Sequence, residues 1–307
     1  MMKNTFGRIM KKDGHIPMMT TRPSMNEIYA DVIRDLRVNG SLVNATVELL
    51  NYQVTLTDPT HLDITHPSRK WSSDYAFAEL AFYLGGQRAV GNMDKLAKIW
   101  GLISDKNGEV ESNYGYHIFS PAFDGGDNMW YSVRDELDSN PNSRRAVIPI
   151  LEKEHIRKND KDYPCTGFIQ FLIRDNKLHL NWNMRSCDAV FGLCNDMFCA
   201  AMLQQLMLNE LNSPKVLGSL GFNITLGDLT FNLGSLHIYS RHWNLLYADL
   251  SEWKGYRGKR YIIKGEITPF SGMRQEYGLK PYDSVEEIKK KAERFKRNLT
   301  VGGDFDG

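Results

Sequence analysis

The sequence has few cysteines, and none in a pattern that would pair them or bind zinc. Of 307 residues, only Cys165, Cys187, Cys194 and Cys199 are cysteines. None belongs to a CxxC pair, and no group of histidines completes a zinc pattern. Residues 1–25 also lack the continuous apolar run of a secretory signal. We therefore expect a cytoplasmic protein with free thiols and no metal.

The sequence also lacks an excess of charge of either sign and an unbroken apolar span. The formal net charge is +1, so no overall basic field favours nucleic acid, and we expect no nucleic-acid partner. The longest apolar stretch, residues 189–208, is interrupted by polar side chains at four positions. This pattern is typical of a buried helix rather than a membrane span.

What is present is a mixture of helical and strand patterns without a βαβ repeat, which predicts an α+β protein. Helices are expected at 26–38, 74–84, 95–103, 127–137, 197–211 and 284–297, the last highly charged. Strands are expected at 42–57, 146–150, 167–173, 178–183, 222–231 and 236–239, with a tight turn at Asp175-Asn176. We predict an N-terminal arm (1–25), a catalytic domain (26–245) and a C-terminal extension (246–307).

Three short motifs follow one another between Tyr163 and Asp196. They are Tyr163-Pro164-Cys165-Thr166, Met184-Arg185-Ser186-Cys187-Asp188 and Phe191-Gly192-Leu193-Cys194-Asn195-Asp196. In this order they resemble the active-site core of the thymidylate synthase superfamily, and within it the deoxycytidylate hydroxymethylase branch of T-even phages. The resemblance covers roughly residues 26–245. It implies a large twisted mixed β-sheet that forms a homodimer interface, flanked by helices.

Cys165 is the candidate nucleophile. Carbon 5 of a pyrimidine is a poor nucleophile until a thiolate adds to carbon 6. A nearby cation favours the thiolate, and two strands joined by a turn would bring Arg185 within reach of Cys165. The structural alternative is that Cys165 is a buried space-filling residue.

Asp196 stands where thymidylate synthases carry the asparagine that reads the pyrimidine ring. A carboxylate accepts from the cytosine amino group, and from ring nitrogen 3 once that nitrogen is protonated. The resemblance therefore implies dCMP as substrate and 5,10-methylenetetrahydrofolate as co-substrate, with no metal. The structural alternative makes Asp196 the N-cap of a helix that starts at Met197.

Glu79 lies inside an apolar helix, where an acid is costly unless it is hydrogen-bonded or functional. The family's matching glutamate organises water and proton transfers at the pyrimidine, and in a hydroxymethylase it would activate the attacking water. Tyr114 matches a tyrosine near the carbon 5 proton. The structural alternative for Glu79 is an exposed helix edge.

The resemblance also assigns the substrate and folate contacts. Arg144 and Arg145 match a pair that reaches the phosphate in the partner's site, although a solvated surface pair is the alternative. On the home subunit the phosphate contacts are Arg185 and Ser186, and the sugar contacts are His237 and Tyr239. The folate contacts are Trp100, Asp188 and Gly192, although a Trp is usually a core residue and a strand His is usually structural.

The sequence departs from the synthase pattern, mostly toward the hydroxymethylase pattern. Ile103 replaces a tryptophan, the family's closing C-terminus is absent, and no phosphate-binding arginine is found near residues 39–45. The expected product is 5-hydroxymethyl-dCMP for modified phage DNA. A dCMP methyltransferase that makes 5-methyl-dCMP stays open, as do CMP or dUMP as substrate and a non-catalytic nucleotide-binding relative.

Overall fold

A mixed β-sheet forms the centre of the fold. The computed structural model describes residues 19–66, 68–121, 127–157, 161–214, 221, 223–249, 258–268 and 273–302. The strands run in the order β1 (Met19–Arg22), β3 (Thr46–Leu56), β8 (Thr225–Tyr239), β6 (Lys177–Met184), β5 (Thr166–Arg174) and β4 (Val147–Pro149). Two short strands join this path: β2 (Ser41–Val43) pairs with β3, and β7 (Cys187–Asp188) pairs with β8. Parallel pairing at β1·β3, β6·β8 and β7·β8, combined with antiparallel pairing elsewhere in the sheet, confirms the α+β prediction.

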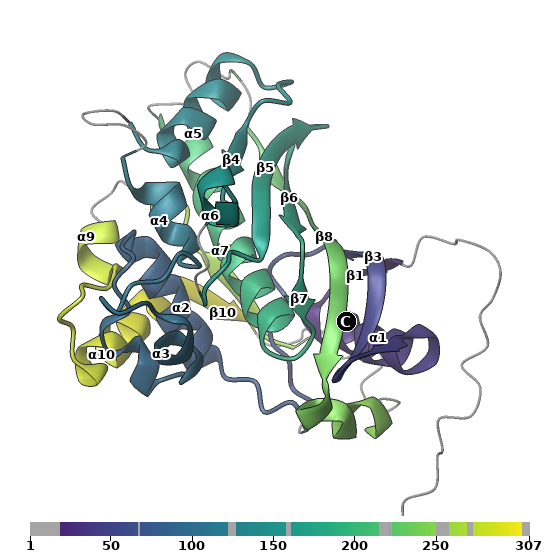
Figure 1. The fold of residues 1–307 in the computed structure, drawn as a ribbon. Coiled ribbons are helices and arrows are strands. Elements are labelled where there is room, and N and C mark those ends of the chain that lie inside the picture. Colours follow the sequence, from purple (N-terminus) through teal and green to yellow (C-terminus); the bar gives the residue numbers. More distant parts are fainter. Residues whose placement is uncertain are drawn as a thin grey trace, which may run out of the picture.

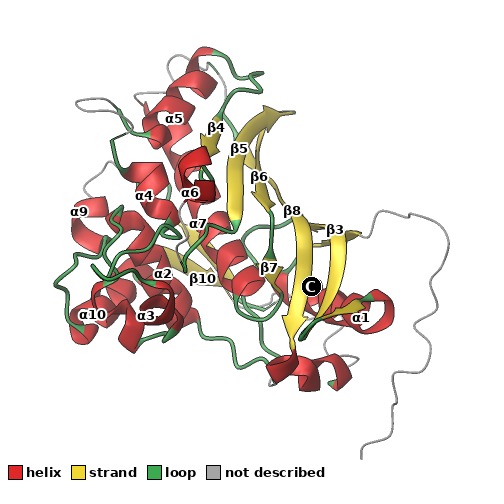
Figure 2. Cartoon of the chain, in the orientation of Figure 1, coloured by secondary structure: helices red, strands yellow, loops and turns green. Residues whose placement is uncertain are grey.

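Most helices gather on one side of the sheet (Figure 1). They are α1 (Met25–Asn39), α2 (Ser73–Gly85), α3 (Ile99–Ile103), α4 (Tyr114–Phe119), α5 (Met129–Ser139), α6 (Lys153–Arg157), α7 (Gly192–Leu211), α9 (Arg274–Tyr277) and α10 (Val285–Lys296), with 3-10 turns η1 (Gly91–Lys95) and η2 (Ser240–Tyr247). A second, two-stranded sheet pairs β9 (Arg260–Ile263) with β10 (Leu299–Gly302) (Figure 2). Within these ranges no helix combines the length and apolarity needed to cross a membrane.

Helices α2 and α7 form the inner helical layer. Helix α7 contacts β6, β7, β8 and α2, and nearly all of its residues are buried, so it is enclosed around its whole circumference. Helix α2 begins at the N-cap Ser72, whose hydroxyl accepts from the Tyr75 backbone N–H, and ends at Gly86 in the left-handed conformation. Both helices bring acidic residues into the protein interior because their buried faces include Glu79 and Asp196.

The other face of the sheet is polar and carries side-chain hydrogen bonds across three strands. Gln53 donates to Asn232 over 2.9 Å, and Asn232 donates to Asn183 over 3.1 Å. The hydroxyls of Thr55 and Thr230 lie 3.2 Å apart on the same face. We call this surface the open sheet face, because its side chains alternate with the buried ones and stay partly exposed.

Several predicted elements differ from the structure. The strand expected at 42–57 is a hairpin, because Asn44 turns the chain with a positive φ of 53°. Residues 95–103 divide into η1 and α3, and the two strands expected at 222–231 and 236–239 are one continuous strand, β8. Helices α4 and α6 were not predicted, because each has only five or six residues and shows no helical periodicity.

The predicted outer segments contact the rest of the fold. Strand β1 pairs in parallel with β3, and helix α10 contacts α2. Residues 1–18 of the predicted arm, Phe222 and the C-terminal residues 303–307 lie outside the described residues. The division into arm, catalytic domain and extension stays a prediction.

Candidate active site

Sheet topology brings the predicted motifs to one end of the sheet. Strand β5 is antiparallel to β6, so Cys165, just before β5, lies beside Arg185, just after β6. Strand β8 is parallel to β6, so its C-terminal residues His237 and Tyr239 reach the same end. Helix α7 starts there too, after β7. The backbone of Arg185 approaches β8 so closely that a Cβ on Gly234 would lie 2.9 Å from the Arg185 carbonyl oxygen.

The Cys165 thiol lies beside the Arg185 guanidinium. Arg185 Nη2 is 3.8 Å from Cys165 Sγ, and the same side chain donates to the carbonyls of Pro164 (3.0 Å) and Tyr163 (2.8 Å). The guanidinium also stacks over the Tyr163 ring at 4.6 Å. Burial raises the pKa of the Cys165 thiol, Arg185 opposes that rise, and the charges of Asp196 and Asp162 add to it. Protonation or pairing of those two carboxylates would therefore lower the pKa of the Cys165 thiol and favour the thiolate.

Two carboxyl groups, those of Asp196 and Glu79, are buried in the interior, and the charge of Asp196 acts on the Cys165 thiol. Burial and the charge of Asp188 together raise the pKa of Asp196 to about 7, against a hydrogen bond from Tyr83. Burial and the charge of Asp196 hold the pKa of Glu79 well above its usual value, against a hydrogen bond from Tyr75. Glu79 Oε2 is buried and has no hydrogen-bond partner among the residues that the structure describes, which is a costly state for a carboxyl oxygen. Neither acid is on an exposed helix edge.

Asp196 lies within helix α7, not at its N-terminus. The helix begins at Gly192 after the N-cap residue Phe191, so the N-cap alternative for Asp196 is wrong. A Cβ on Gly192 would lie 3.6 Å from Asp196 Oδ2 and 3.7 Å from Asp188 Cβ. Gly192 therefore occupies the space between the two acids. The helix starts earlier than its apolar pattern suggests because the Gly-Leu turn is itself its first turn.

Aromatic side chains enclose the acids. Tyr114, at the start of α4, packs against Tyr83 (ring centroids 5.5 Å apart) and Trp182 (5.8 Å), and its hydroxyl hydrogen-bonds to Thr166. Trp100 is buried, and its ring N–H donates to the Tyr75 hydroxyl over 3.0 Å. Because Tyr75 in turn hydrogen-bonds to Glu79, Trp100 is linked to Glu79 through one tyrosine.

Tyr75 and Tyr83 are site residues that the sequence reasoning missed. They stand four residues before and four after Glu79, so all three side chains share one face of α2. That spacing was present in the sequence, but the helix is apolar all round and does not distinguish this face from the others.

The candidate sugar contacts His237 and Tyr239 lie on β8, and the candidate folate contact Asp188 lies on the neighbouring strand β7. His237 is buried and its ring centroid is 5.0 Å from that of Tyr239, which is partly exposed. Asp188 is the Cα partner of His237 across the strand pair β7·β8. Its Oδ1 accepts from the Val190 backbone N–H at 2.9 Å, and its Oδ2 is 3.8 Å from the Arg241 guanidinium.

Two predicted phosphate ligands are not brought into this cluster. Arg144 and Arg145 are exposed on the loop before β4, and among the described residues no side-chain hydrogen bond or ion pair joins either to Cys165 or Arg185. Ser186, by contrast, is half-buried immediately after Arg185. In a single chain, the arginine pair is therefore on the surface.

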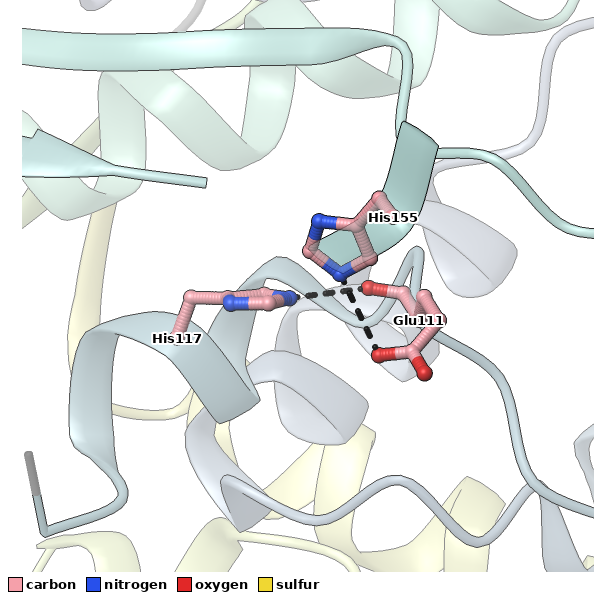
Figure 3. Close-up of side chains that lie close together, drawn as sticks. All are labelled: Glu111, His117 and His155. Carbon is pink, nitrogen blue, oxygen red and sulfur yellow. Dashed lines mark hydrogen bonds and ion pairs between the residues drawn. The ribbon is translucent and has the colours of Figure 1, made fainter. Parts of the chain in front are cut away.

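Within the described part of the chain, the side chains of Glu111, His117 and His155 form one cluster of metal-type ligands (Figure 3). Its hydrogen bonds fix tautomers that oppose metal binding. His155 Nδ1 accepts from the Glu152 backbone N–H at 2.8 Å, so Nε2 carries the hydrogen and points at Glu111 from 3.4 Å. His117 Nε2 donates to the Glu111 carbonyl at 3.0 Å, and Arg88 pairs with the Glu111 carboxylate. The cluster is a hydrogen-bonded network between the chain segments that lead to α4 and to Cys165.

Comparison with known proteins agrees with this arrangement. The sequence profile of the thymidylate synthase family matches residues 27–293. Deoxycytidylate 5-hydroxymethyltransferase of enterobacteria phage T6 is 33% identical over 202 residues, covering 63% of this chain and 76% of that protein. The enzyme of the same name from phage T4 is 33% identical over 184 residues, 57% of this chain and 70% of that protein. Thymidylate synthase of Fusobacterium nucleatum is 28% identical over 154 residues, about half of each chain.

A solved structure extends the agreement to the fold. The thermostable thymidylate synthase A of Bacillus subtilis superposes with a TM-score of 0.62 and 17% identity, covering 90% of this chain and 94% of that one. The fold predicted from the motifs is confirmed, and the chain belongs to the thymidylate synthase family.

Proposed function

We propose that this protein transfers a one-carbon unit from 5,10-methylenetetrahydrofolate to carbon 5 of dCMP and releases 5-hydroxymethyl-dCMP. The observation that carries the proposal is the placement of Asp196. It is buried, its pKa is about 7, and its charge interacts with those of both Cys165 and Glu79. The names of the phage relatives support the same assignment.

A carboxyl group with a pKa near 7 is suited to cytosine. Its neutral form donates to ring nitrogen 3 and accepts from the amino group, so both polar edges of the base are paired. The same proton can equally lie on nitrogen 3, with Asp196 ionised. Uracil presents a ring N–H in that position and a carbonyl oxygen beside it. An ionised Asp196 accepts from the ring N–H but has no donor for that carbonyl oxygen, which would stay unpaired in a buried site, so the carboxylate form discriminates against uracil.

The chemical sequence uses the groups that surround the base. The Cys165 thiolate adds to carbon 6, and carbon 5 then attacks the methylene carbon of the folate. Water takes the carbon 5 proton beside Tyr114. Glu79, whose raised pKa favours its protonated form, gives its proton to the nitrogen of the departing tetrahydrofolate, which leaves an exocyclic methylene. The resulting Glu79 carboxylate accepts a proton from the water that adds to the methylene, and expulsion of the Cys165 thiolate then frees the product.

The remaining candidates supply binding contacts. Arg185 and Ser186 would hold the phosphate from the home subunit, while His237 and Tyr239 hold the sugar. The folate would lie against Trp100, Asp188 and Gly192. The exposed pair Arg144 and Arg145 would complete the phosphate site of a partner subunit, with the open sheet faces of two chains forming the homodimer interface. This arrangement would explain why an exposed arginine pair belongs to the motif set.

Mass analysis of the product tests the proposal directly. The protein is incubated with methylenetetrahydrofolate and dCMP, with dUMP and CMP in parallel, and Cys165→Ser as the control. We expect dCMP to gain one formaldehyde equivalent with release of tetrahydrofolate, and no product from the variant. A gain of one methylene group with formation of dihydrofolate would identify a methyltransferase instead. Turnover of dUMP alone, or of no nucleotide, would contradict the proposal.

A further inference from the structure

Three polar residues form a row across the strand ends of the site. His237 on β8 has Glu48 of β3 as its Cα partner on one side and Asp188 of β7 as its partner on the other. Directly opposed residues in a sheet project their side chains to the same face. The imidazole therefore lies between two carboxylates, of which only Asp188 belongs to the predicted site.

Ser235 connects Glu48 to the imidazole. Its Oγ is 2.5 Å from Glu48 Oε1 and 3.5 Å from His237 Nδ1. A carboxylate only accepts hydrogen bonds, so the single hydroxyl hydrogen of Ser235 is donated to Glu48. The Ser235 hydroxyl oxygen then has only lone pairs to offer to Nδ1, and the Ser235 backbone also hydrogen-bonds to the His237 ring. Both contacts favour a ring hydrogen on Nδ1, on the side of Ser235.

The hydrogen on Nδ1 determines the protonation of the other ring nitrogen, Nε2. Burial lowers the pKa of His237, which keeps the ring neutral despite the acids on both sides. A neutral imidazole with hydrogen at Nδ1 has an unprotonated Nε2 that acts only as an acceptor. No hydrogen bond to Nε2 is made within the described part of the chain, so this lone pair is available to a ligand.

We propose that Glu48 and Ser235 are positioning residues that hold His237 with its hydrogen on Nδ1, so that Nε2 accepts a hydrogen bond from the 3′-hydroxyl of the nucleotide sugar. This inference rests on the proposed function, because it assigns the nucleotide to this site. The hydrogen bond to Nε2 would make the protein selective for nucleotides whose 3′ oxygen carries a hydrogen. A glutamine at position 48 would donate to Ser235, which would turn its own hydrogen toward Nδ1 and move the ring hydrogen to Nε2.

Binding measurements separate this role from a structural one. Calorimetry gives the affinities of dCMP and 2′,3′-dideoxy-CMP for wild type, Glu48→Gln and Ser235→Ala. Wild type should prefer dCMP by about tenfold, the value of one buried hydrogen bond. Both variants should lose that preference while their affinity for the dideoxy ligand stays unchanged. Thr55→Ala, on the same strand and face as Glu48 but hydrogen-bonded only to Thr230, should keep the preference. Equal weakening of both ligands in the two variants would overturn the inference.

The tautomer provides a readout that does not need substrate. Nitrogen NMR of the ligand-free protein, with the His237 signals assigned through His237→Gln, should show hydrogen at Nδ1 in wild type and at Nε2 in Glu48→Gln. Hydrogen at Nε2 in wild type would overturn the inference whatever the substrate is. If wild type shows the Nδ1 tautomer but does not bind dCMP, the proposed function and the sugar contact fail together, and only the positioning of the ring by Glu48 and Ser235 stands.

Discussion

Two buried carboxyl groups set the chemistry at the residue scale. The charge of Asp196 raises the cost of ionising Glu79, and that of Asp188 raises the cost of ionising Asp196. Each of the two buried acids accepts a hydrogen bond from one tyrosine, Glu79 from Tyr75 and Asp196 from Tyr83. Such a pair holds protons near neutral pH, where an isolated aspartate or glutamate would have lost them. A site that pairs with an acceptor nitrogen and hydrates a methylene group needs protons in that pH range.

Asp196 should make dCMP binding depend on pH. The complex holds one proton between the carboxyl and ring nitrogen 3, whereas free Asp196 loses its proton above a pH of about 7. Binding above that pH takes up a proton, so the dissociation constant of dCMP should rise by up to about tenfold per pH unit. Calorimetry from pH 7 to 9 measures this slope. A dissociation constant that does not change with pH would contradict a proton shared between Asp196 and ring nitrogen 3.

Asp196→Asn provides the matched specificity test. Asparagine presents a donor and an acceptor that pair with uracil, so kcat/KM for dCMP should fall by about a hundredfold or more while dUMP binding improves. The pH dependence of nucleotide binding should vanish in this variant. Retention of full dCMP activity would show that another group reads the base.

The same substitution should stabilise the fold at high pH. Asp196 ionises in the unfolded chain from its usual pKa of 3.8 but in the folded chain only at about 7. The folded state therefore binds more protons between these values, and stability falls as pH rises through that interval. Relative to wild type, Asp196→Asn should gain about 2–3 kcal/mol between pH 5 and pH 8. Urea unfolding at both pH values measures the difference, and a constant offset would contradict the raised pKa.

At the residue scale, the sequence was sufficient to name candidate site residues from their motifs, but it did not predict which side chains surround them. Cys165, Arg185 and Asp196 could be named because their motifs are specific and lie in adjacent elements. The N-cap alternative for Asp196 failed because the start of α7 is set by the Gly-Leu turn rather than by a capping side chain. Tyr83 could not be predicted as a partner of Asp196, because this contact depends on which face α2 turns toward α7. A helix with apolar residues on every face does not indicate that orientation.

At the scale of elements, a close contact between α2 and α4 positions Tyr114. A Cβ on Gly115 would lie 1.8 Å from the Tyr83 carbonyl oxygen, so only glycine allows α4 to lie against the backbone of α2. This contact places the Tyr114 ring beside Tyr83 and above Thr166. The sequence showed an Asn-Tyr-Gly motif, but the glycine's function becomes evident only once the two helices are seen together.

Gly115→Ala should therefore be strongly destabilising. Helix α4 would have to move away from α2, and overpacking of this kind costs about 3 kcal/mol. Gly265→Ala is the matched control, because no atom lies within 4 Å of the added Cβ; its effect should stay within about 0.5 kcal/mol. Thermal unfolding compares the two variants. Equal stabilities would show that α4 is not held by this contact.

At the scale of the whole molecule, two surfaces stay at least partly exposed among the described residues of one chain. The open sheet face presents the hydrogen-bonded row Gln53, Asn232 and Asn183, and the arginine pair lies exposed before β4. The fold class followed from the mixture of patterns and from the motifs. The sheet order did not, because parallel pairing of β6 with β8 joins segments about 50 residues apart that no local pattern relates. That pairing is what brings the sugar-side residues to Cys165.

If Arg144 and Arg145 act in the partner's site, two inactive variants should restore each other. Arg145→Ala removes a phosphate contact from the neighbouring site, and Cys165→Ser removes the nucleophile from its own. A mixed dimer then carries both defects in one site and none in the other, so co-expression in equal amounts should give about a quarter of wild-type activity. Each variant alone stays below that level, because every site of its dimer is defective. If the arginine acts in its own chain, both sites of a mixed dimer contain a defect and mixing restores nothing. Activity of the co-purified, differently tagged dimer, in which one of the two sites is intact, should be about half of the wild-type activity and distinguishes the two arrangements.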